Sequence, residues 1–170
     1  MTRLFVTADV HGSYSTWTTL KQLMEPQDCL VIAGDLFDTR YGNDSLADFL
    51  PELIKQEIQT IPQTFYYVYG NCDLPLFFPG HEPSLGFKAF GKNIFLHHGH
   101  MSPDLPEESD IIIQGHTHVC LLERKNTRIY MNPGTLTNPR NQLHTYGIIE
   151  PRQVRIMDLN TGKPVFMVDL

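Results

Sequence analysis

Three short apolar runs in the first half of the chain have the length of buried strands. They cover residues 4–8, 29–33 and 64–69. Between the first two runs, Ser13 can cap a helix on which Trp17 and Leu20 recur at helical spacing. This alternation of strand and helix predicts a parallel sheet in the first half of the chain.

Apolar residues also recur with helical spacing over residues 44–58, between the second and third strands. Pro51 lies inside this pattern and lacks the backbone N–H that a helix interior needs. The helix is therefore expected either to kink at Pro51 or to begin there, with the proline in its first turn.

The second half of the chain consists of short strand-like runs. They are expected at residues 88–90, 94–97, 110–114, 119–123, 128–131, 145–150, 153–158 and 164–168. The turn at residues 160–162, Asn-Thr-Gly, favours a hairpin, and the proline-rich residues 74–86 are expected to form an irregular loop. We infer one α/β domain over residues 1–170, a four-layer αββα sandwich in which helices flank two packed mixed β-sheets.

Composition narrows the class of protein. The 170 residues are 41% hydrophobic and carry a net charge of −6 without a run of Lys or Arg. This argues against a basic face for nucleic acid, whereas a small anionic substrate is allowed if metals invert the local charge. No segment approaches membrane-spanning length, and the N-terminal apolar stretch is too short for a signal peptide. Three cysteines without paired spacing suggest a cytoplasmic location.

Aspartate, asparagine and histidine residues repeatedly follow the end of an apolar strand. Five such motifs occur: Asp9-x-His11, Gly34-Asp35, Gly70-Asn71-Cys72-Asp73, His98-Gly99-His100 and Gly115-His116-Thr117-His118. Because sites in α/β sheets form at the carboxyl ends of strands, these side chains are expected to converge. One such motif alone is more often a turn or a surface pair. Five in order indicate a metal site with oxygen and imidazole ligands.

The order of these motifs resembles the calcineurin-like metallophosphoesterase superfamily. Gly-Asn-Cys-Asp at residues 70–73, the compact chain and Asn-Pro-Gly-Thr at residues 132–135 are similar to its small YfcE-like phosphodiesterase branch. The resemblance spans residues 5–150. It implies hydrolysis of small-molecule phosphodiesters by in-line attack of a hydroxide that bridges two divalent metal ions. Mn²⁺ is expected first, with Fe²⁺, Ni²⁺, Co²⁺ or Zn²⁺ as alternatives.

The resemblance also implies the ligands of each metal. The first metal would be held by Asp9, His11, Asp35 and His118, and the second by Asp35, Asn71, His98 and His116. Asp35 would then bridge the two ions. Asn71 and His98 are also implied to act in catalysis. His100 either contacts the substrate or a metal's outer shell, or it is a turn residue.

Cys72 is the main departure from the superfamily pattern. Many members have a histidine at this place, which helps to protonate the leaving group or to bind the transition state. A thiol hydrogen-bonds weakly and is a poorer proton donor beside an anionic site. We therefore expect modest turnover and a preference for good leaving groups. The alternative is that Cys72 is a small apolar filler.

Residues around these motifs have competing interpretations. Asp38 and Asp73 either accept hydrogen bonds from ligand histidines or cap turns. Arg140 could contact a substrate phosphate, but the favoured interpretation is an exposed surface charge. The remaining histidines are assigned to structure or surface; they are His81, His97 and His144. The Asn-Pro-Gly-Thr turn is expected to pack close to the site.

Two other functions compete with a small-molecule phosphodiesterase. One is a nuclease with the same metals, which the acidic balance disfavours. The other is a non-catalytic scaffold, like the retromer subunit that shares this fold and also lacks the motif histidine. The expected partner is a small phosphodiester and not a membrane, and the sequence leaves open whether the chain forms a homo-oligomer.

Overall fold

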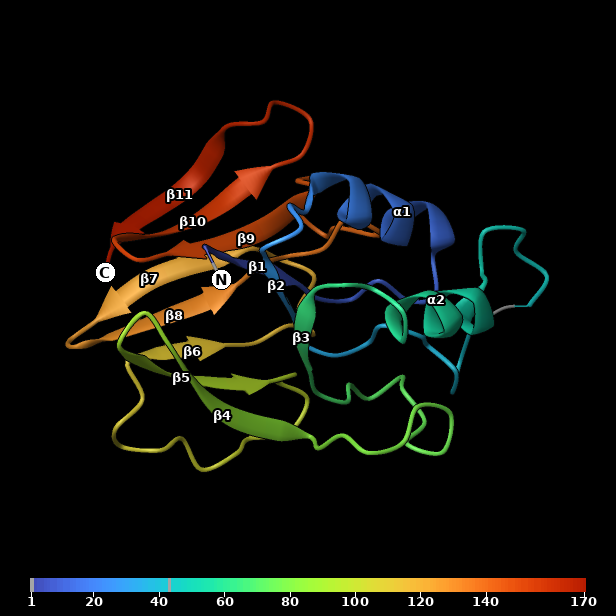
Figure 1. Ribbon diagram of the computed structural model, residues 1–170, viewed down its shortest axis with the longest axis horizontal. Helices are drawn as coiled ribbons and strands as arrows, with labels where there is room; N and C mark the ends of the chain where they lie inside the picture. The colour runs from blue at the N-terminus through green and yellow to red at the C-terminus, as the bar shows by residue number, and fades with distance from the viewer. Residues whose placement is uncertain (1, 43) are drawn as a thin grey trace.

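The computed structural model describes residues 2–42 and 44–170 and contains two stacked β-sheets (Figure 1). The first sheet has, in spatial order, β11 (Pro164–Asp169), β10 (Gln153–Asp158), β9 (Thr145–Glu150), β1 (Leu4–Thr7), β2 (Cys29–Ile32) and β3 (Thr64–Tyr67). The second has β4 (Ser84–Ala89), β5 (Lys92–His97), β6 (Ile111–Ile113), β8 (Arg128–Asn132) and β7 (Leu121–Lys125). Within the described residues, the helices are α1 (Tyr14–Leu23) and α2 (Pro51–Ile58).

Both sheets are mixed, and their parallel strands bring loops to one edge. In the first sheet β1, β2 and β3 are parallel, and the register pairs Leu4 with Cys29 and Cys29 with Thr64. In the second sheet β5, β6 and β8 are parallel. These three strands run in the same direction and pair residue for residue. The loops that follow β1, β2 and β3 therefore leave the sheet at the same edge.

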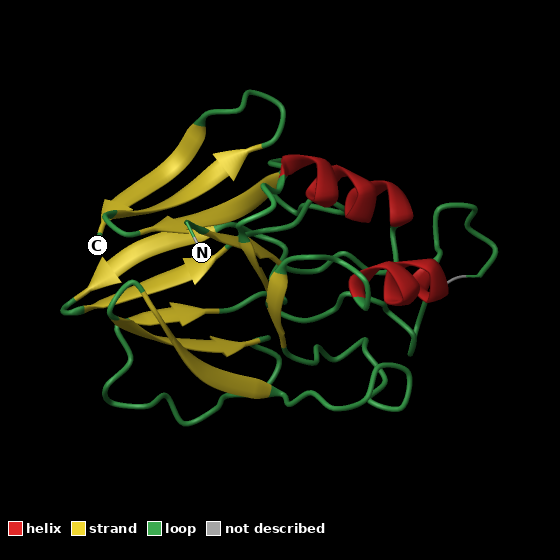
Figure 2. Ribbon diagram, in the orientation of Figure 1, coloured by secondary structure: helices red, strands yellow, loops and turns green. Residues whose placement is uncertain are grey.

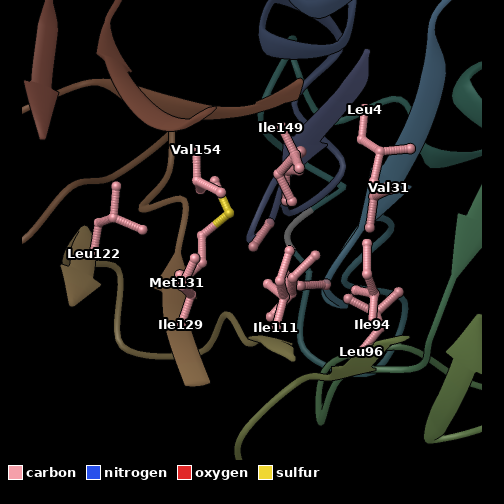
Figure 3. Packing of buried hydrophobic residues seen from close by; sticks show 14 of the residues in the cluster. Leu4, Val31, Ile94, Leu96, Ile111, Leu122, Ile129, Met131, Ile149 and Val154 are labelled. Atoms are coloured by element: carbon pink, nitrogen blue, oxygen red, sulfur yellow. The ribbon is translucent and has the colours of Figure 1, made fainter. Parts of the chain in front are cut away.

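The core between the sheets comes from alternate residues of each strand. Leu4 and Val31 of the first sheet face Ile94, Ile111 and Ile129 of the second (Figure 3). These side chains are at most 2% exposed. Fully burying one such side chain stabilises the fold by about 1.5–3 kcal/mol.

The opposite face of the first sheet is covered by the two helices, which lie on one side of the molecule (Figure 2). Phe5 and Leu30 point to this side, where they join Trp17 of α1 and Ile54 and Ile58 of α2 in a second buried cluster. Ser13 caps α1 by accepting a hydrogen bond from the Thr16 amide, as the sequence predicted. Neither described helix is long and apolar enough to span a membrane.

The predicted sandwich of two mixed sheets is confirmed, and in the described part of the chain its helices lie on the six-stranded sheet. Helix α2 begins at Pro51, so the alternative of a first-turn proline was right. The helical pattern over residues 44–50 was misleading. Leu46 is 58% exposed and Leu50 is 41% exposed, because these residues form turns before the helix starts. The predicted loop at residues 74–86 was also too long, since β4 begins at Ser84.

Candidate metal centre

Five of the predicted ligands have left-handed backbone conformations. Asp9, His11 and Asp35 have φ angles of 56°, 53° and 52°, and His116 and His118 have φ angles of 69° and 57°. A non-glycine residue pays about 1–2 kcal/mol for this conformation, and such strain clusters at functional sites. Backbone hydrogen bonds between the loops hold it, among them one from the His11 amide to the Asp35 carbonyl at 2.9 Å.

Glycines let the candidate ligands approach neighbouring backbone. A Cβ atom on Gly70 would lie 1.9 Å from Oδ1 of Asp35. A Cβ atom on Gly34 would lie 2.4 Å from Nδ1 of His98, and Gly34 also has a φ of +85°. Space therefore requires glycine at both positions, and at Gly34 the left-handed backbone conformation requires it as well.

The first group of converging ligand atoms belongs to Asp9, His11 and His118, which lie within 4.8 Å of one another. His118 donates its Nδ1 proton to the Asn138 carbonyl at 3.0 Å, because a carbonyl oxygen can only accept. His11 Nδ1 lies 3.1 Å from the Asp38 carboxylate and donates to it. The Nε2 atoms of the two histidines lie 3.1 Å apart, and in the neutral rings both therefore face each other with lone pairs.

The second group is built around His98. Its Nδ1 atom donates to the Ala33 carbonyl at 2.7 Å, so Nε2 carries a lone pair in the neutral ring. Nε2 lies 3.1 Å from Oδ1 of Asn71 and 3.1 Å from Oδ2 of Asp35. Asp9 lies farther away, with its Oδ1 atom 4.0 Å from Nε2. In the neutral ring Nε2 points with these oxygens at one place, and in the protonated ring it donates to Asp35.

The pKa values of the two central carboxyls are shifted in opposite directions, although burial acts to raise both. Burial raises the pKa of the Asp9 carboxyl to about 7. Burial also acts to raise the pKa of Asp35, but the hydrogen bond with His98 and its charge outweigh it and lower the pKa to about 2. Converging carboxylates and lone pairs fit a divalent cation, which would offset the cost of burying these charges. The donor set of oxygen and imidazole atoms fits Mn²⁺ or a similar ion.

His116 and His100 lie at the margin of the centre. The His116 amide donates to the Asp9 carboxylate at 3.0 Å, and its ring centroid is 5.1 Å from that of His98. His116 belongs to none of the tight ligand groups found among residues 2–42 and 44–170. The His100 ring is 5.4 Å from His98, and within the described chain its Nδ1 atom is buried without a hydrogen-bond partner.

Asp9 is the residue that the two ligand groups share, whereas the family resemblance assigns the bridge to Asp35. The charge of Asp35 nevertheless acts on the pKa of all four candidate histidine ligands. Asp35 therefore occupies an electrostatically central position between both groups.

Asp38 and Asp73 have different roles. Asp38 accepts a hydrogen bond from a candidate ligand, His11, as one of the two interpretations predicted. Asp73 is 2% exposed and instead accepts amide hydrogen bonds, among them those of Phe37 at 2.9 Å and Gly70 at 3.1 Å. Asp73 thus ties the Gly34-Asp35 loop to the Gly70-Asn71 loop and acts as a cap.

Cys72 is buried beside the centre. Its backbone amide donates to Oδ1 of Asp35 at 2.8 Å, and its Sγ atom accepts from Nδ2 of the Asn71 side chain at 3.2 Å. Burial, followed by the charge of Asp35, raises the pKa of the thiol. The backbone of Cys72 therefore helps to hold Asp35, whatever its side chain does.

The Asn-Pro-Gly-Thr turn, whose role the sequence left open, supports both ligand loops. Asn132 is buried and donates to the Gly115 carbonyl at 2.7 Å and to the Thr117 hydroxyl at 3.0 Å. Thr135 donates to the Asp9 carbonyl at 2.7 Å. The placement of this motif immediately after a strand, like the ligand motifs, was the sequence signal for such a role.

The other histidines and Arg140 lie outside the ligand groups. His97 is 6% exposed and contacts Phe95 on β5, and His144 donates to the Leu136 carbonyl at 3.0 Å. His81 stacks on Phe78. Arg140 is exposed, although its charge lowers the pKa of His116 and His118.

Comparisons with known proteins agree with this geometry. The calcineurin-like phosphoesterase superfamily domain matches residues 2–153. The phosphodiesterase YfcE of Escherichia coli is 26% identical over 172 residues, and the alignment covers 94% of this chain and 94% of YfcE. A probable metallophosphoesterase of Mycoplasma pneumoniae is 30% identical over 180 residues, which cover 96% of this chain and 99% of the relative.

Solved structures show the same fold. The E. coli phosphoesterase YfcE superimposes with a TM-score of 0.83 at 24% identity over 98% of both chains. Vacuolar protein sorting 29 from Cryptosporidium parvum gives a TM-score of 0.70 at 19% identity, over 99% of this chain and 97% of the other. The domain match covers most of the chain and includes all five motifs. The chain therefore belongs to the calcineurin-like phosphoesterase superfamily and is a hydrolase of phosphoric esters.

Proposed function

We propose that this protein is a dinuclear metal-dependent phosphodiesterase that acts on small-molecule phosphodiesters. When bound, two divalent ions supply an acidified water and a clamp on the phosphoryl oxygens for in-line displacement. We propose Mn²⁺ as the native metal, because the ligand set combines several imidazoles with carboxylates. The relatives named phosphodiesterase and metallophosphoesterase support this class of reaction.

The observation that carries the proposal is the convergence of lone pairs. Nε2 of His11 and Nε2 of His118 are 3.1 Å apart, and both Nδ1 protons are already donated elsewhere. A purely structural pair of neutral histidines would place a proton between these atoms. In the same way, Nε2 of His98 faces two oxygen acceptors. A cation in each group explains the arrangement of both.

The proposed ligands keep the assignment made from the motifs. Asp9, His11, Asp35 and His118 would hold one ion, and Asp35, Asn71, His98 and His116 the other. Asp35 is proposed as the bridge because its charge acts on the imidazoles of both groups. Its Oδ1 atom is oriented by the Cys72 amide at 2.8 Å.

The protein's own groups would orient these ligands and the substrate. Asp38, the Ala33 carbonyl and the Asn138 carbonyl fix which nitrogen of His11, His98 and His118 faces the centre. Asn71 is neutral, so it leaves more positive charge for an anionic phosphoryl group than a carboxylate would. His100 is proposed to contact the substrate through its ring, whose Nδ1 atom has no hydrogen-bond partner among the described residues. Cys72 is proposed not to donate a proton efficiently, because burial raises the pKa of its thiol.

The molecular context is proposed from the same observations. Residues 1–170 would form one metallophosphoesterase domain, in which β10 and β11 extend the six-stranded sheet. All three cysteines are buried and free, which supports a reducing compartment, the cytoplasm. The net charge of −6 disfavours nucleic acid as the substrate.

Metal stoichiometry and activity on one sample test the proposal. Purified protein is exhaustively chelated and then titrated with Mn²⁺ under equilibrium dialysis, while hydrolysis of bis(p-nitrophenyl) phosphate is followed. We expect two ions per chain, with activity that rises as the second ion binds. Full activity without metal would exclude the metal mechanism, and saturation at one ion would exclude the dinuclear one.

The same experiment separates the enzyme from a scaffold. Vps29 from Cryptosporidium parvum shares the fold at 19% identity, which by itself says nothing about the activity of this chain. Protein that binds two ions and hydrolyses no diester, monoester or short oligonucleotide would favour the scaffold. Preferential cleavage of the oligonucleotide would favour a nuclease.

A further inference from the structure

A cavity of about 620 Å³ lies beside His11 and His118, on one side of the proposed metal centre. Its walls come from the start of α1, the loop between β2 and α2, and the loop after β8. This open cavity has room for a group the size of a nucleoside. Because it opens next to two proposed ligands, a substrate bound at the metals would extend into it.

The walls of the cavity are uncharged or acidic. Hydroxyls are contributed by Ser15 and Thr137, and apolar groups by Leu46 and Phe49. Among the described residues that line it, the side chains with a fixed charge are carboxylates, and neither Lys nor Arg is present. Arg40 and Arg140, whose charges act on histidines of the centre, are not among these lining residues.

The N-terminus of α1 would ordinarily make this cavity attractive to a second anion. The first turn of a helix presents unpaired N–H groups and a partial positive charge, and α1 has ten residues with no acidic residue in its first turn. Here Asp48, from the loop before α2, occupies that position. Its Oδ1 atom accepts the Ser15 amide at 2.8 Å, and its Oδ2 atom accepts the hydroxyls of Ser13 at 2.6 Å and Ser15 at 2.9 Å.

The same contacts keep Asp48 ionised. Asp48 is exposed, and its slight desolvation acts to raise its pKa, but the hydrogen bonds from Ser13 and Ser15 outweigh this and lower the pKa below its ordinary value. A carboxylate of the protein thus fills the anion position beside the cavity and adds its negative charge to that of Asp38. An arm of the substrate that carried its own phosphate would meet repulsion and would find the helix N-terminus already occupied.

We propose that this cavity receives one of the two alcohol arms of the phosphodiester, that this arm is uncharged and up to nucleoside size, and that Asp48 selects against arms carrying a phosphate. The inference rests on the proposed function, since it places the reacting phosphoryl group at the metals. It goes further by naming the class of alcohol and the residue that determines it.

Two diesters that differ by one phosphate test this specificity. Thymidine 5′-(p-nitrophenyl phosphate) and its 3′-phosphorylated counterpart release the same nitrophenol. For the Mn²⁺-loaded protein we expect kcat/KM to be at least about tenfold higher for the uncharged nucleoside. Asp48→Asn keeps an oxygen acceptor for the helix and removes the charge, so the ratio should fall to within about threefold. Asp169→Asn, the same change at an exposed site on β11, should leave the ratio unchanged.

A binding measurement makes the result independent of activity. Amide NMR spectra of chelated protein are recorded during titration with thymidine and with thymidine 3′-phosphate. Thymidine should shift the resonances of Ser15 and Thr137 but not that of Asp169. Thymidine 3′-phosphate should shift them in Asp48→Asn and much less in the original protein.

The outcomes distinguish this inference from the proposed function. If thymidine shifts the expected resonances but neither diester is cleaved, the proposed function fails and the cavity assignment stands. If both diesters are cleaved at similar rates by the original protein, or Asp48→Asn leaves the ratio unchanged, the selection by Asp48 is wrong. If thymidine shifts no cavity resonance, the cavity does not receive the alcohol arm.

Discussion

Cys72 lies beside the proposed centre, yet its thiol is poorly suited to release a proton there. Burial and the charge of Asp35 raise its pKa. Close to it, Oδ1 of Asp38 is buried and, within the described residues, has no hydrogen-bond partner. Ligand atoms of Asp38, Cys72 and His11 lie within 4.8 Å of one another. A better proton donor at position 72 would therefore find an acceptor in place to orient it.

Cys72→His should raise the rate, mainly for diesters with poor leaving groups. General acid assistance is typically worth about 10²–10⁴-fold, and a retrofitted imidazole should reach the lower part of that range at most. The gain should appear in kcat more than in KM, because the interaction forms chiefly in the transition state. The measurement is kcat for a series of aryl and alkyl diesters, together with metal content.

Cys72→Ser is the matched control and should change little, since a hydroxyl is no better as an acid. Metal content is needed because the larger ring could displace Asn71 and lose an ion. A Cys72→His protein that holds both ions and gains nothing on any substrate would show that residue 72 is not at the acid's position.

Asp35→Asn should reduce the affinity for both ions and lower the rate by about two orders of magnitude or more, because the change removes the charge shared by the two groups. Asp169→Asn, an exposed residue at the end of β11, should keep full metal content and rate. The measurement is metal content by mass spectrometry alongside kcat. If Asp35→Asn lost only one ion while Asp9→Asn lost two, Asp9 would be the bridge.

The proposed ligands are carried by loops that the strands bring together, and these loops are held by hydrogen bonds from other loops. The loop after β6 carries His116 and His118, and it is held by Asn132 at the end of β8. The loop after β1 is held by Thr135 through the Asp9 carbonyl. Supports of this kind orient ligands that sit in strained backbone conformations.

Asn132→Ala should therefore weaken metal binding about tenfold or more without removing a ligand. It leaves the buried Gly115 carbonyl without its partner, so unfolding should become easier by about 1–3 kcal/mol. Asn160→Ala, in the exposed β10–β11 turn, is the control and should not change metal affinity. The measurements are Mn²⁺ affinity and the urea midpoint. Unchanged affinity in a folded Asn132→Ala protein would limit Asn132 to a structural role.

At the scale of the whole molecule, the proposed metal centre draws its ligands from both sheets. Asp9 and Asp35 follow strands of the six-stranded sheet, whereas His98 and His116 follow strands of the five-stranded sheet. Ions held by all four would cross-link the sheets at one edge and stabilise the folded state by mass action.

Chelation should thus abolish diester hydrolysis and lower the melting temperature. At a Mn²⁺ concentration 100 times the dissociation constant, binding is worth about 2.7 kcal/mol, which corresponds to a rise of several degrees. Mg²⁺ should restore activity and stability less well, because it prefers oxygen ligands and keeps its waters. Thermal unfolding and rate are measured in parallel. Equal stability of the chelated and Mn²⁺-loaded protein would contradict the cross-link.

The sequence by itself determined approximately where most strands lie and which types of residue follow them. The apolar run of residues 29–33, for example, is followed directly by Gly34-Asp35. Such a pattern involves only neighbouring residues, so it can be read from the sequence. The helix start at Pro51 was one of two local alternatives. Local spacing misled at Leu46, whose exposure depends on what the rest of the fold places against it.

Only the tertiary structure decided which nitrogen of each histidine faces the centre, since the partners of His98 and His118 are carbonyls 65 and 20 residues away in sequence. The same holds for the contact of Asp73 with the Phe37 amide on another loop, and for Asp48 at the start of α1. Such contacts join segments that chain spacing cannot relate. They form only when packing of the two sheets and the helices brings the loops to one edge.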